Sequence, residues 1–229
     1  MLDNYSQQQK TMVNELENTF ANGNHKSTVV DMQKDYANDD QICLTSVVFI
    51  PNEISKIITD KIINPLRAIE PMHYYYPPDS MHLTIKNIRT INKPPLFSQT
   101  DIEKTQNLYS KIIPKFQKFE FNVEDAVLFP TSLSVMAYSK DTLKDLVLSL
   151  DKGLKEIGVP DNKKYLSDSV FWGNITVCRF TQKPSQEFIH MAKQLRNLKI
   201  GKFNINKISL ITCNAVCRSR QIIAEYSLV

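Results

Sequence analysis

Two short stretches of the chain carry the residue types that phosphate chemistry needs. The first runs His82-Leu83-Thr84-Ile85-Lys86, and its polar and apolar side chains alternate as in a half-buried strand. Successive side chains of a strand point to opposite faces, so His82, Thr84 and Lys86 are expected to share one face. That face would present an imidazole, a hydroxyl and an ammonium group in a row, which suits a phosphate.

The second stretch, 171–180, has the same form, with Asn174 where the first has His82. Histidine can remove or donate a proton near neutral pH, because its ordinary pKa is about 6.5. The amide of asparagine cannot. The hydroxyls of Thr84 and Thr176 can hydrogen-bond the non-bridging oxygens of a phosphodiester, where negative charge grows during cleavage. Two such strands would flank one phosphate symmetrically.

Composition and charge narrow the class of protein. The net charge of +4, from 28 Lys and Arg against 24 Asp and Glu, is compatible with a nucleotide or nucleic-acid partner without demanding one. No His/Cys/Asp cluster has metal-ligand spacing, so no metal and no other cofactor is expected. The four cysteines lack disulfide-framework spacing, which predicts a reduced, cytoplasmic protein. No apolar run suits a signal peptide or a membrane span, so no membrane partner is expected.

The elements that must position the two stretches occur twice in the same order. In the first half, apolar patterns and proline boundaries predict strand, helix, motif strand and helix at 42–50, 52–64, 81–88 and 98–116, with a short tyrosine-rich strand at 74–76. The second half is predicted to contain strands at 119–129 and 133–138, a helix at 141–157, the motif strand 171–180, a helix at 184–198, and closing strands at 203–212 and 221–228.

The simplest architecture for this order is α+β, with two similar lobes whose antiparallel sheets face one another across a central groove. Each lobe would give its motif strand to the groove, so that His82 and Asn174 both line it. This bilobal domain is expected to span 41–229. Residues 1–40 are polar, and we expect a partly helical N-terminal appendage, with a helix at 6–20 and a second weak helix or a tether at 26–39.

The stretches 81–85 and 173–180 resemble the paired His-x-Thr/Ser motifs of the two-histidine (2H) phosphoesterase superfamily, in particular its 2′-5′ RNA ligase-like and cyclic phosphodiesterase branch. The second stretch continues into Arg179-Phe180, as it often does in that family. The resemblance covers roughly 41–229, in the order of elements as well as in the motifs. It implies the bilobal fold and metal-free acid–base chemistry on a 2′,3′-cyclic phosphate or a 2′-5′ linkage of RNA or a nucleotide.

By the same resemblance, His82 and Thr84 correspond to a catalytic histidine and its phosphate-binding partner, and Thr176 to the second phosphate ligand. Asn174 departs from the pattern, because it stands in place of the second histidine. An amide there can still donate a hydrogen bond to phosphate. Loss of one acid–base partner typically lowers the rate by about a hundred- to ten-thousandfold.

Four further residues are candidates for substrate binding, each with a simpler structural interpretation beside it. Lys86 shares the expected face of His82, although a solvated lysine is the ordinary case. Tyr76 belongs to a tyrosine-rich strand, which can stack a base or only pack the core. Trp172 can wall the groove or fill the core. Arg179 falls on the face opposite Asn174 by strict alternation and reaches a phosphate only through a bulge or at the end of the strand. Cys178 is expected on the groove face.

Three functions stay open at this point. One is a hydrolase of the 2H type, with its activity impaired by Asn174. The second is a catalytically inactive protein that binds RNA or a nucleotide phosphate on the same fold. The third is an interaction module that uses the polar N-terminal segment and the basic surface. The first requires a proton-transfer group to replace the missing histidine, and His73 and Tyr165 are titratable groups in the neighbourhood by sequence.

Overall fold

The computed structural model describes residues 4–21 and 29–229, and no helix within these ranges is long and apolar enough to cross a membrane. The α-helices are α1 (Asn4–Ala21), α2 (Asn52–Ile58), α3 (Asn64–Ile69), α4 (Gln99–Ile112), α5 (Asp141–Glu156) and α6 (Gln186–Gln194). The strands are β1 (Ile42–Phe49), β2 (Tyr74–Tyr75), β3 (His82–Asn92), β4 (Phe119–Phe129), β5 (Ser132–Tyr138), β6 (Gly173–Arg179), β7 (Lys199–Ile205), β8 (Lys207–Cys213) and β9 (Arg220–Ser227).

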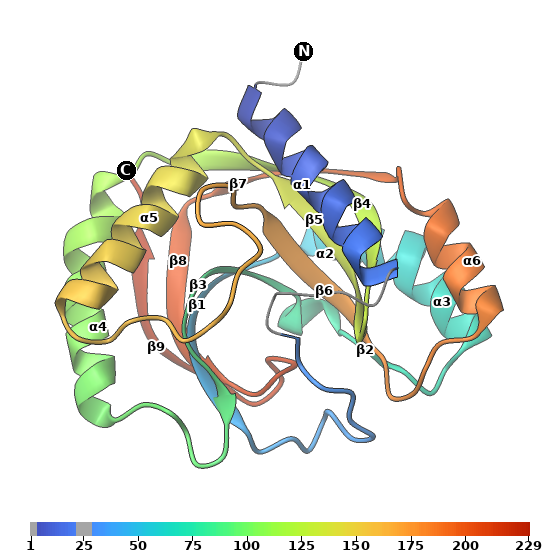
Figure 1. Ribbon diagram of the computed structural model, residues 1–229, viewed down its shortest axis with the longest axis horizontal. Coiled ribbons are helices and arrows are strands. Elements are labelled where there is room, and N and C mark those ends of the chain that lie inside the picture. Colours follow the sequence, from blue (N-terminus) through green and yellow to red (C-terminus); the bar gives the residue numbers. More distant parts are fainter. Residues whose placement is uncertain (1–3, 22–28) are drawn as a thin grey trace.

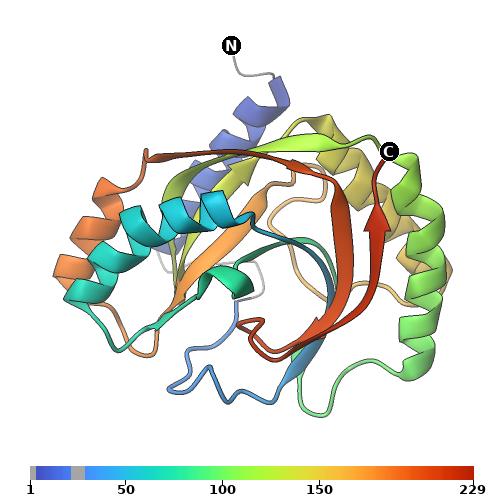
Figure 2. The same cartoon turned by 180° about the vertical axis from the view of Figure 1, so that it is seen from behind.

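All of these strands form one curled antiparallel sheet (Figures 1 and 2). The strand order is β7-β4-β5-β6-β3-β1-β8-β9, and β2 pairs with β6 outside this path. The order has an internal symmetry, because β6-β5-β4 on one side of the centre corresponds to β3-β1-β8 on the other. The two predicted lobes are therefore the two halves of a continuous sheet, and the predicted α+β fold with paired lobes is confirmed.

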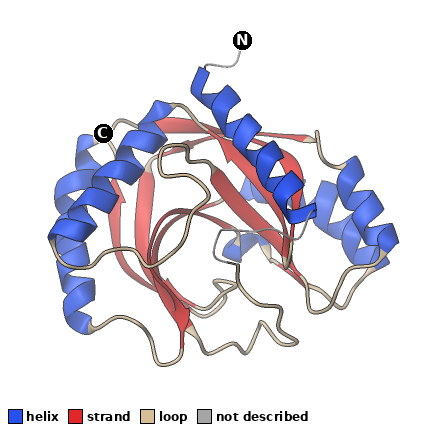
Figure 3. Cartoon of the chain, viewed as in Figure 1, coloured by secondary structure: helices blue, strands red, loops and turns tan. Residues whose placement is uncertain are grey.

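The helices that connect equivalent strands cross from one half of the sheet to the other. The pair α2 and α3 follows β1, yet α2 packs on β7 and α3 on α6 in the opposite half. In the same way α5 follows β5 but packs on β3 and α4. The helices therefore gather at both ends of the sheet, and on one side of its middle, where β3 and β6 lie, loops rather than helices cross over the strands (Figures 1 and 3).

Helix α5 shows how the sequence determines this packing. Leu143, Leu146, Leu150 and Leu154 recur at helical spacing and are all buried, so that one face of the helix seals the sheet while the other remains polar. This confirms the helix that the leucine pattern predicts.

The two halves of the sheet meet at the centre of the two motifs, where Leu83 of β3 pairs with Ile175 of β6. Both side chains are fully buried. Gly173 makes this close approach possible, because a Cβ there would lie 2.2 Å from Leu83 Cδ1 and 2.9 Å from Ala137 Cβ.

We expect Gly173→Ala to destabilise the protein by about 1–3 kcal/mol, because the added methyl group forces Leu83 out of a closely packed site. In an open strand the same substitution usually stabilises, since it lowers the entropy of the unfolded chain. Urea unfolding measures the change in the free energy of unfolding. An unchanged or increased stability would contradict the close contact of β3 and β6.

Each motif strand has a β-bulge directly after its threonine. In β3 the partners of Ser46 and Val47 are Lys86 and Thr84, so Ile85 is the extra residue. The strand β6 is interrupted at the equivalent place: Leu133 pairs with Cys178 and Ser134 with Thr176, which leaves Val177 extra. A bulge shifts the alternation of side chains by one position. The faces predicted from strict alternation are therefore wrong beyond each threonine.

Two predicted elements also differ from the observed ones. The closing strand expected at 203–212 is two strands: β7 pairs with β4 and β8 pairs with β1, with Asn206 between them, so the chain passes between the halves there. Pro65 does not end the helix that begins at Asn52. A π-helical turn at Thr59–Ile63 precedes it, and Pro65 lies in the first turn of α3, where a missing N–H is tolerated.

Of the N-terminal region 1–40, residues 4–21 and 29–40 are described, and α1 is its regular element. This helix packs on β4 and β5, with Val13 buried against them (Figure 1). Gln9 Nε2 donates to the carbonyl of Phe171 at 2.5 Å, directly before β6. Residues 29–40 contain no helix, and positions 26–28 of the second expected helix lie outside the described ranges.

Candidate functional site

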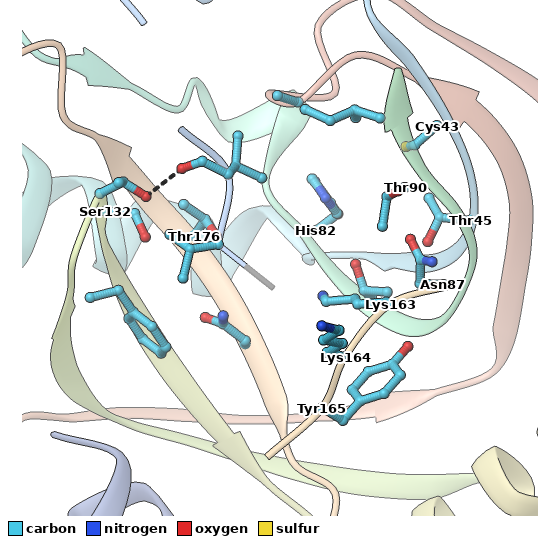
Figure 4. A pocket seen from close by; sticks show the side chains of 18 of the residues that line it. Cys43, Thr45, His82, Asn87, Thr90, Ser132, Lys163, Lys164, Tyr165 and Thr176 are labelled. Carbon is cyan, nitrogen blue, oxygen red and sulfur yellow. Dashed lines mark hydrogen bonds between the residues drawn. The ribbon is translucent and has the colours of Figure 1, made fainter. Parts of the chain in front are cut away.

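A cavity of about 510 Å³ lies over the junction of β3 and β6. Its volume falls within the range of small-molecule sites. Residues from both motifs line it, namely His82 and Thr84 from β3 and Asn174 and Thr176 from β6. Figure 4 shows His82 and Thr176 on opposite sides of this space. The two sequence stretches therefore do meet at one site, as the pairing Leu83–Ile175 requires.

The bulges decide which later residues of each strand reach the cavity. Within the two residues after each bulge, Asn87 and Arg179 line the cavity, whereas Lys86 and Cys178 do not. These two positions are equivalent, since each follows its threonine by three residues. Arg179 is thus placed where it can meet a phosphate, after the bulge and at the end of β6, the two conditions under which such a contact was expected.

Because of the same bulges, the side chains of Lys86 and Cys178 do not line the cavity. Lys86 is 4% exposed and forms ion pairs with Asp151 and Asp161, each at 2.8 Å. It does not face the cavity together with His82, which corrects the expected face. Cys178 is buried in the core beside Tyr75, and burial raises the pKa of its thiol well above the ordinary value. The expectation that it faces the groove is also wrong.

His82 is held by a backbone hydrogen bond and lies next to a thiol. Its Nδ1–H donates to the carbonyl of Ser80 at 2.8 Å, so Nε2 is the nitrogen that titrates. Burial by itself lowers the pKa of His82. The hydrogen bond and negative charge of Cys217, with the Ser80 carbonyl, outweigh burial and raise the pKa above its ordinary value. The imidazole consequently retains its proton to a higher pH than a free histidine.

The residues on the β6 side are more open to solvent. Asn174 is exposed, and Thr176 is half-buried and accepts a hydrogen bond from Ser134 Oγ at 3.4 Å. Asn174 has the position equivalent to His82 but no titratable proton. The arrangement thus offers two hydroxyls, one amide and one imidazole around a central space.

Two aromatic residues predicted to bind substrate also line the cavity. Tyr76 is almost fully buried; its hydroxyl donates to the carbonyl of Ala215 at 3.0 Å and accepts from Arg179 Nε at 3.4 Å. Burial raises the pKa of Tyr76 to about 12, so it stays protonated near neutral pH. Tyr76 therefore holds Arg179 in place. Trp172 packs on the cluster that includes Val127 and Met136 and also lines the cavity.

The loop 159–172 supplies lysines that the motif analysis did not identify. Lys163, Lys164 and Tyr165 all line the cavity, and Figure 4 shows both lysines on the same side of this space as His82. Burial lowers the pKa of Lys163; the positive charges of Arg179 and Lys86 act in the same direction, against Asp161. Lys163 is thus a stronger acid than a solvated lysine.

Asp161 anchors this loop to β3. Its carboxylate pairs with Lys86 Nζ at 2.8 Å and accepts hydrogen bonds from Asn87 Nδ2 at 2.8 Å and from the Tyr165 hydroxyl. The backbone N–H of Lys163 donates to the same carboxylate at 2.7 Å. Lys86, although absent from the cavity, therefore helps to position the residues that do line it.

The charges at the cavity favour an anion. Lys163, Lys164 and Arg179 are cationic, and Asp31 is the acidic side chain among the described lining residues. No group of three or more His, Cys, Asp or Glu side chains in the described part of the chain is arranged to hold a metal ion. Phosphate groups are bound by this combination of cations and hydroxyl donors.

Comparison with known proteins was carried out at the level of sequence and of structure. No protein-family model and no curated protein matches the sequence. Solved structures do match. A phosphoesterase matches with a TM-score of 0.58 and 14% identity, and the match covers 83% of this chain and 99% of that chain. TT0787 of Thermus thermophilus matches with a TM-score of 0.58 and 14% identity, and the match covers 82% of this chain and 97% of that chain. E. coli LigT complexed with NADP+ matches with a TM-score of 0.57 and 14% identity, covering 83% and 99%. The chain has the phosphoesterase fold.

Within this phosphoesterase fold, seven of the eight predicted site residues line the one cavity, and Lys86 does not. Those in the cavity are His82, Thr84, Asn174, Thr176, Tyr76, Trp172 and Arg179. Of the two titratable groups considered as replacements for the second histidine, Tyr165 lines the cavity, whereas His73 is buried against Glu70 outside it, with its Nε2 2.9 Å from Glu70 Oε2. The motif analysis missed Lys163, and the sequence feature that could have identified it is the run Lys163-Lys164-Tyr165, two basic residues and an aromatic one in a polar loop.

Proposed function

We propose that the chain is a phosphoesterase-like protein that binds the 2′,3′-cyclic phosphate or 2′-5′ phosphodiester of an RNA or nucleotide between β3 and β6 and hydrolyses it slowly. The observation that carries this proposal is the pair of equivalent strands whose threonines and His82 line one cationic cavity. Structures of E. coli LigT exist with phosphate, 3′-AMP and ATP, which supports a phosphate-bearing ligand for a cavity on this fold.

In the proposed reaction, Thr84 and Thr176 bind the non-bridging oxygens and Arg179 offsets their charge. Water attacks phosphorus, the bond to one ribose oxygen breaks, and that oxygen takes up a proton. His82, with its raised pKa, is protonated near neutral pH and can donate this proton to a leaving group on its side. Lys163, with its lowered pKa, can in its neutral form take the proton that the attacking water loses.

The second candidate function is binding without turnover, and Asn174 favours it. An exposed amide at the position equivalent to His82 can donate a hydrogen bond to phosphate but cannot serve as acid or base. The two functions use the same binding contacts and differ only in proton transfer.

Lys163→Arg separates the two functions, because arginine keeps the positive charge but does not release its proton in proteins. If the chain is an enzyme, hydrolysis of 2′,3′-cyclic AMP should fall about a hundredfold or more, with its Kd changed less than about threefold. Chromatographic product assays and calorimetry measure the two quantities. Turnover that is absent in the unmodified chain, together with retained binding, would support the binding function. Absence of both would contradict the proposal.

Binding should also depend on the charge of His82. Below the raised pKa of His82 the imidazolium attracts the singly charged cyclic phosphate, so affinity is expected to be high there and to fall as pH rises through that pKa. Loss of one charge-assisted hydrogen bond corresponds to about a ten- to hundredfold change in Kd. Calorimetric titrations from pH 5.5 to about 9 measure it. His82→Gln should remove this step, and a variant that keeps it would show that another group titrates.

A further inference from the structure

The segment 29–40, which we call the strap, joins the two halves of the sheet beside the cavity (the blue loop at the lower edge of Figure 1). Near its start, the carbonyl of Val30 accepts a hydrogen bond at 2.8 Å from Thr131 Oγ1, in the turn between β4 and β5. Near its end, the carbonyl of Asp39 accepts one at 3.3 Å from Asn214 Nδ2, directly after β8. Thr131 and Asn214 both line the cavity, and β5 and β8 belong to opposite halves of the sheet. The strap therefore crosses one end of the groove between these halves.

A buried tyrosine fixes the strap to the rest of the protein. Tyr36 is 1% exposed and packs in the main core, with its ring centroid 6.1 Å from that of Tyr74. The Tyr36 hydroxyl donates to the carbonyls of Phe180 at 3.2 Å and Asp31 at 3.3 Å, and it accepts from the backbone N–H of Gln33 at 3.3 Å. Phe180 directly follows β6. The hydroxyl thus holds the strap against the end of the second motif strand.

The strap also forms part of the cavity wall. Four of its residues line the cavity: Val29, Val30, Asp31 and Gln33. Another part of the wall comes from the loop 159–172, so two irregular segments bound the space between β3 and β6. The enclosed volume of about 510 Å³ is that of a site for one small molecule, for which about 300–1,000 Å³ is typical. An RNA strand, by contrast, needs an open exit for every phosphodiester that continues beyond the bound nucleotide.

The charge of the strap is opposite to that of the cavity. Residues 29–40 contain one lysine and four aspartates, namely Asp31, Asp35, Asp39 and Asp40. Asp40 pairs with Lys93, whereas Asp31 and Asp35 are exposed. In an open basic groove each further phosphate of a strand would add affinity, because it meets another cation. A strand that leaves the cavity past the strap would meet carboxylates in their place, which repel it.

We propose that the strap restricts the cavity to a single nucleotide, so that a 2′,3′-cyclic mononucleotide binds more tightly than the same cyclic phosphate at the end of an RNA strand. This inference rests on the proposed function and selects the nucleotide over the RNA among its ligands. The strap acts in two ways. Its backbone, held by Thr131 and Tyr36, occupies the end of the groove, and its carboxylates repel a further phosphate there.

Calorimetry on the full chain with two ligands tests this selection. The ligands are 2′,3′-cyclic AMP and an adenosine tetranucleotide that ends in the same cyclic phosphate, both at about 0.15 M salt. We expect the unmodified chain to bind the mononucleotide about tenfold more tightly or better. Equal affinities, or tighter binding of the tetranucleotide, would overturn the inference and leave the proposed function standing. Binding of neither ligand would contradict the proposed function, and the inference with it.

Tyr36→Phe shows whether the strap causes the preference, because phenylalanine keeps the ring in the core and removes the hydroxyl that holds the strap. The preference for the mononucleotide should fall about five- to tenfold, through tighter binding of the tetranucleotide. The Kd of 2′,3′-cyclic AMP should change less than about twofold, since Tyr36 does not line the cavity.

The matched control is Tyr226→Phe, which removes a hydroxyl that donates to the carbonyl of Gln106 at 3.3 Å, between β9 and α4. This variant should keep the preference of the unmodified chain. A folded Tyr36→Phe variant that also keeps that preference would refute the role given to the strap.

Discussion

Asn174→His is expected to raise the hydrolysis of 2′,3′-cyclic AMP by about a hundred- to ten-thousandfold. The cavity already has His82 on β3, threonines on both motif strands and Arg179 beyond the second bulge. A histidine at the equivalent position of β6 would complete the pair, so that one imidazole removes a proton and the other donates one. The pH–rate profile should become bell-shaped, because one histidine must be neutral and the other protonated.

Two further variants show whether the gain comes from this pair. Adding His82→Ala to Asn174→His should abolish the gain, since a single histidine cannot fill both roles. Asn174→Gln, an amide of similar polarity, should leave the rate at the level of the unmodified chain. If Asn174→His folds and binds the nucleotide without any rise in rate, the cavity lacks catalytic geometry, and binding without turnover becomes the better account.

Lys86→Met is expected to lower the free energy of unfolding by about 3–5 kcal/mol, because it leaves the buried carboxylate of Asp161 without its cation, whereas the more exposed Asp151 still pairs with Lys155. The Lys86 ammonium lies between Asp151 and Asp161, and the Asp161 side chain is only 4% exposed. The loop 159–172 should loosen as well, since Asp161 holds the Tyr165 hydroxyl and the Lys163 backbone. Denaturant unfolding measures the first effect and amide hydrogen exchange in the loop the second.

The matched control for Lys86 is Lys56, which pairs with Asp60 at 2.6 Å on the surface of the protein. Lys56→Met should cost less than about 1 kcal/mol, because water screens an exposed pair. Adding Asp161→Asn to Lys86→Met should recover part of the stability by removing the unpaired charge. Equal costs for Lys86→Met and Lys56→Met would contradict a buried ionic anchor.

The motif strands illustrate how far the sequence predicts the site. Periodicity and motif resemblance were sufficient to place His82, Thr84 and Thr176 around one space, because alternation holds over the first three residues of each motif. The alternation of faces ends at Ile85 in β3 and at Val177 in β6, because each strand has one extra residue there relative to its paired strand. A bulge depends on the register with the neighbouring strand, so alternation within a single strand could not reveal that Lys86 turns away from the cavity.

Other features of the site arise from contacts between residues far apart in the chain. Asp161 and Lys86 are brought together by the tertiary fold, and their pairing turns a polar loop into a wall of the cavity. The same holds for Cys43 and Cys213, whose proximity requires β8 to pair with β1. The sequence pattern around 203–212 is continuous in apolar character, so it could not show that Asn206 divides two strands belonging to different halves.

The most direct test of phosphate binding between the two motif strands is a histidine NMR titration with 3′-AMP. Ring resonances of His82 should shift with a saturable dependence on nucleotide, and the pKa of His82 should rise further when the anion is bound. His73, buried against Glu70, and His190, exposed on α6, serve as internal references and should not move. If His82 stays unchanged at saturating nucleotide, or if His190 shifts in its place, the ligand does not lie between β3 and β6 and the account is contradicted.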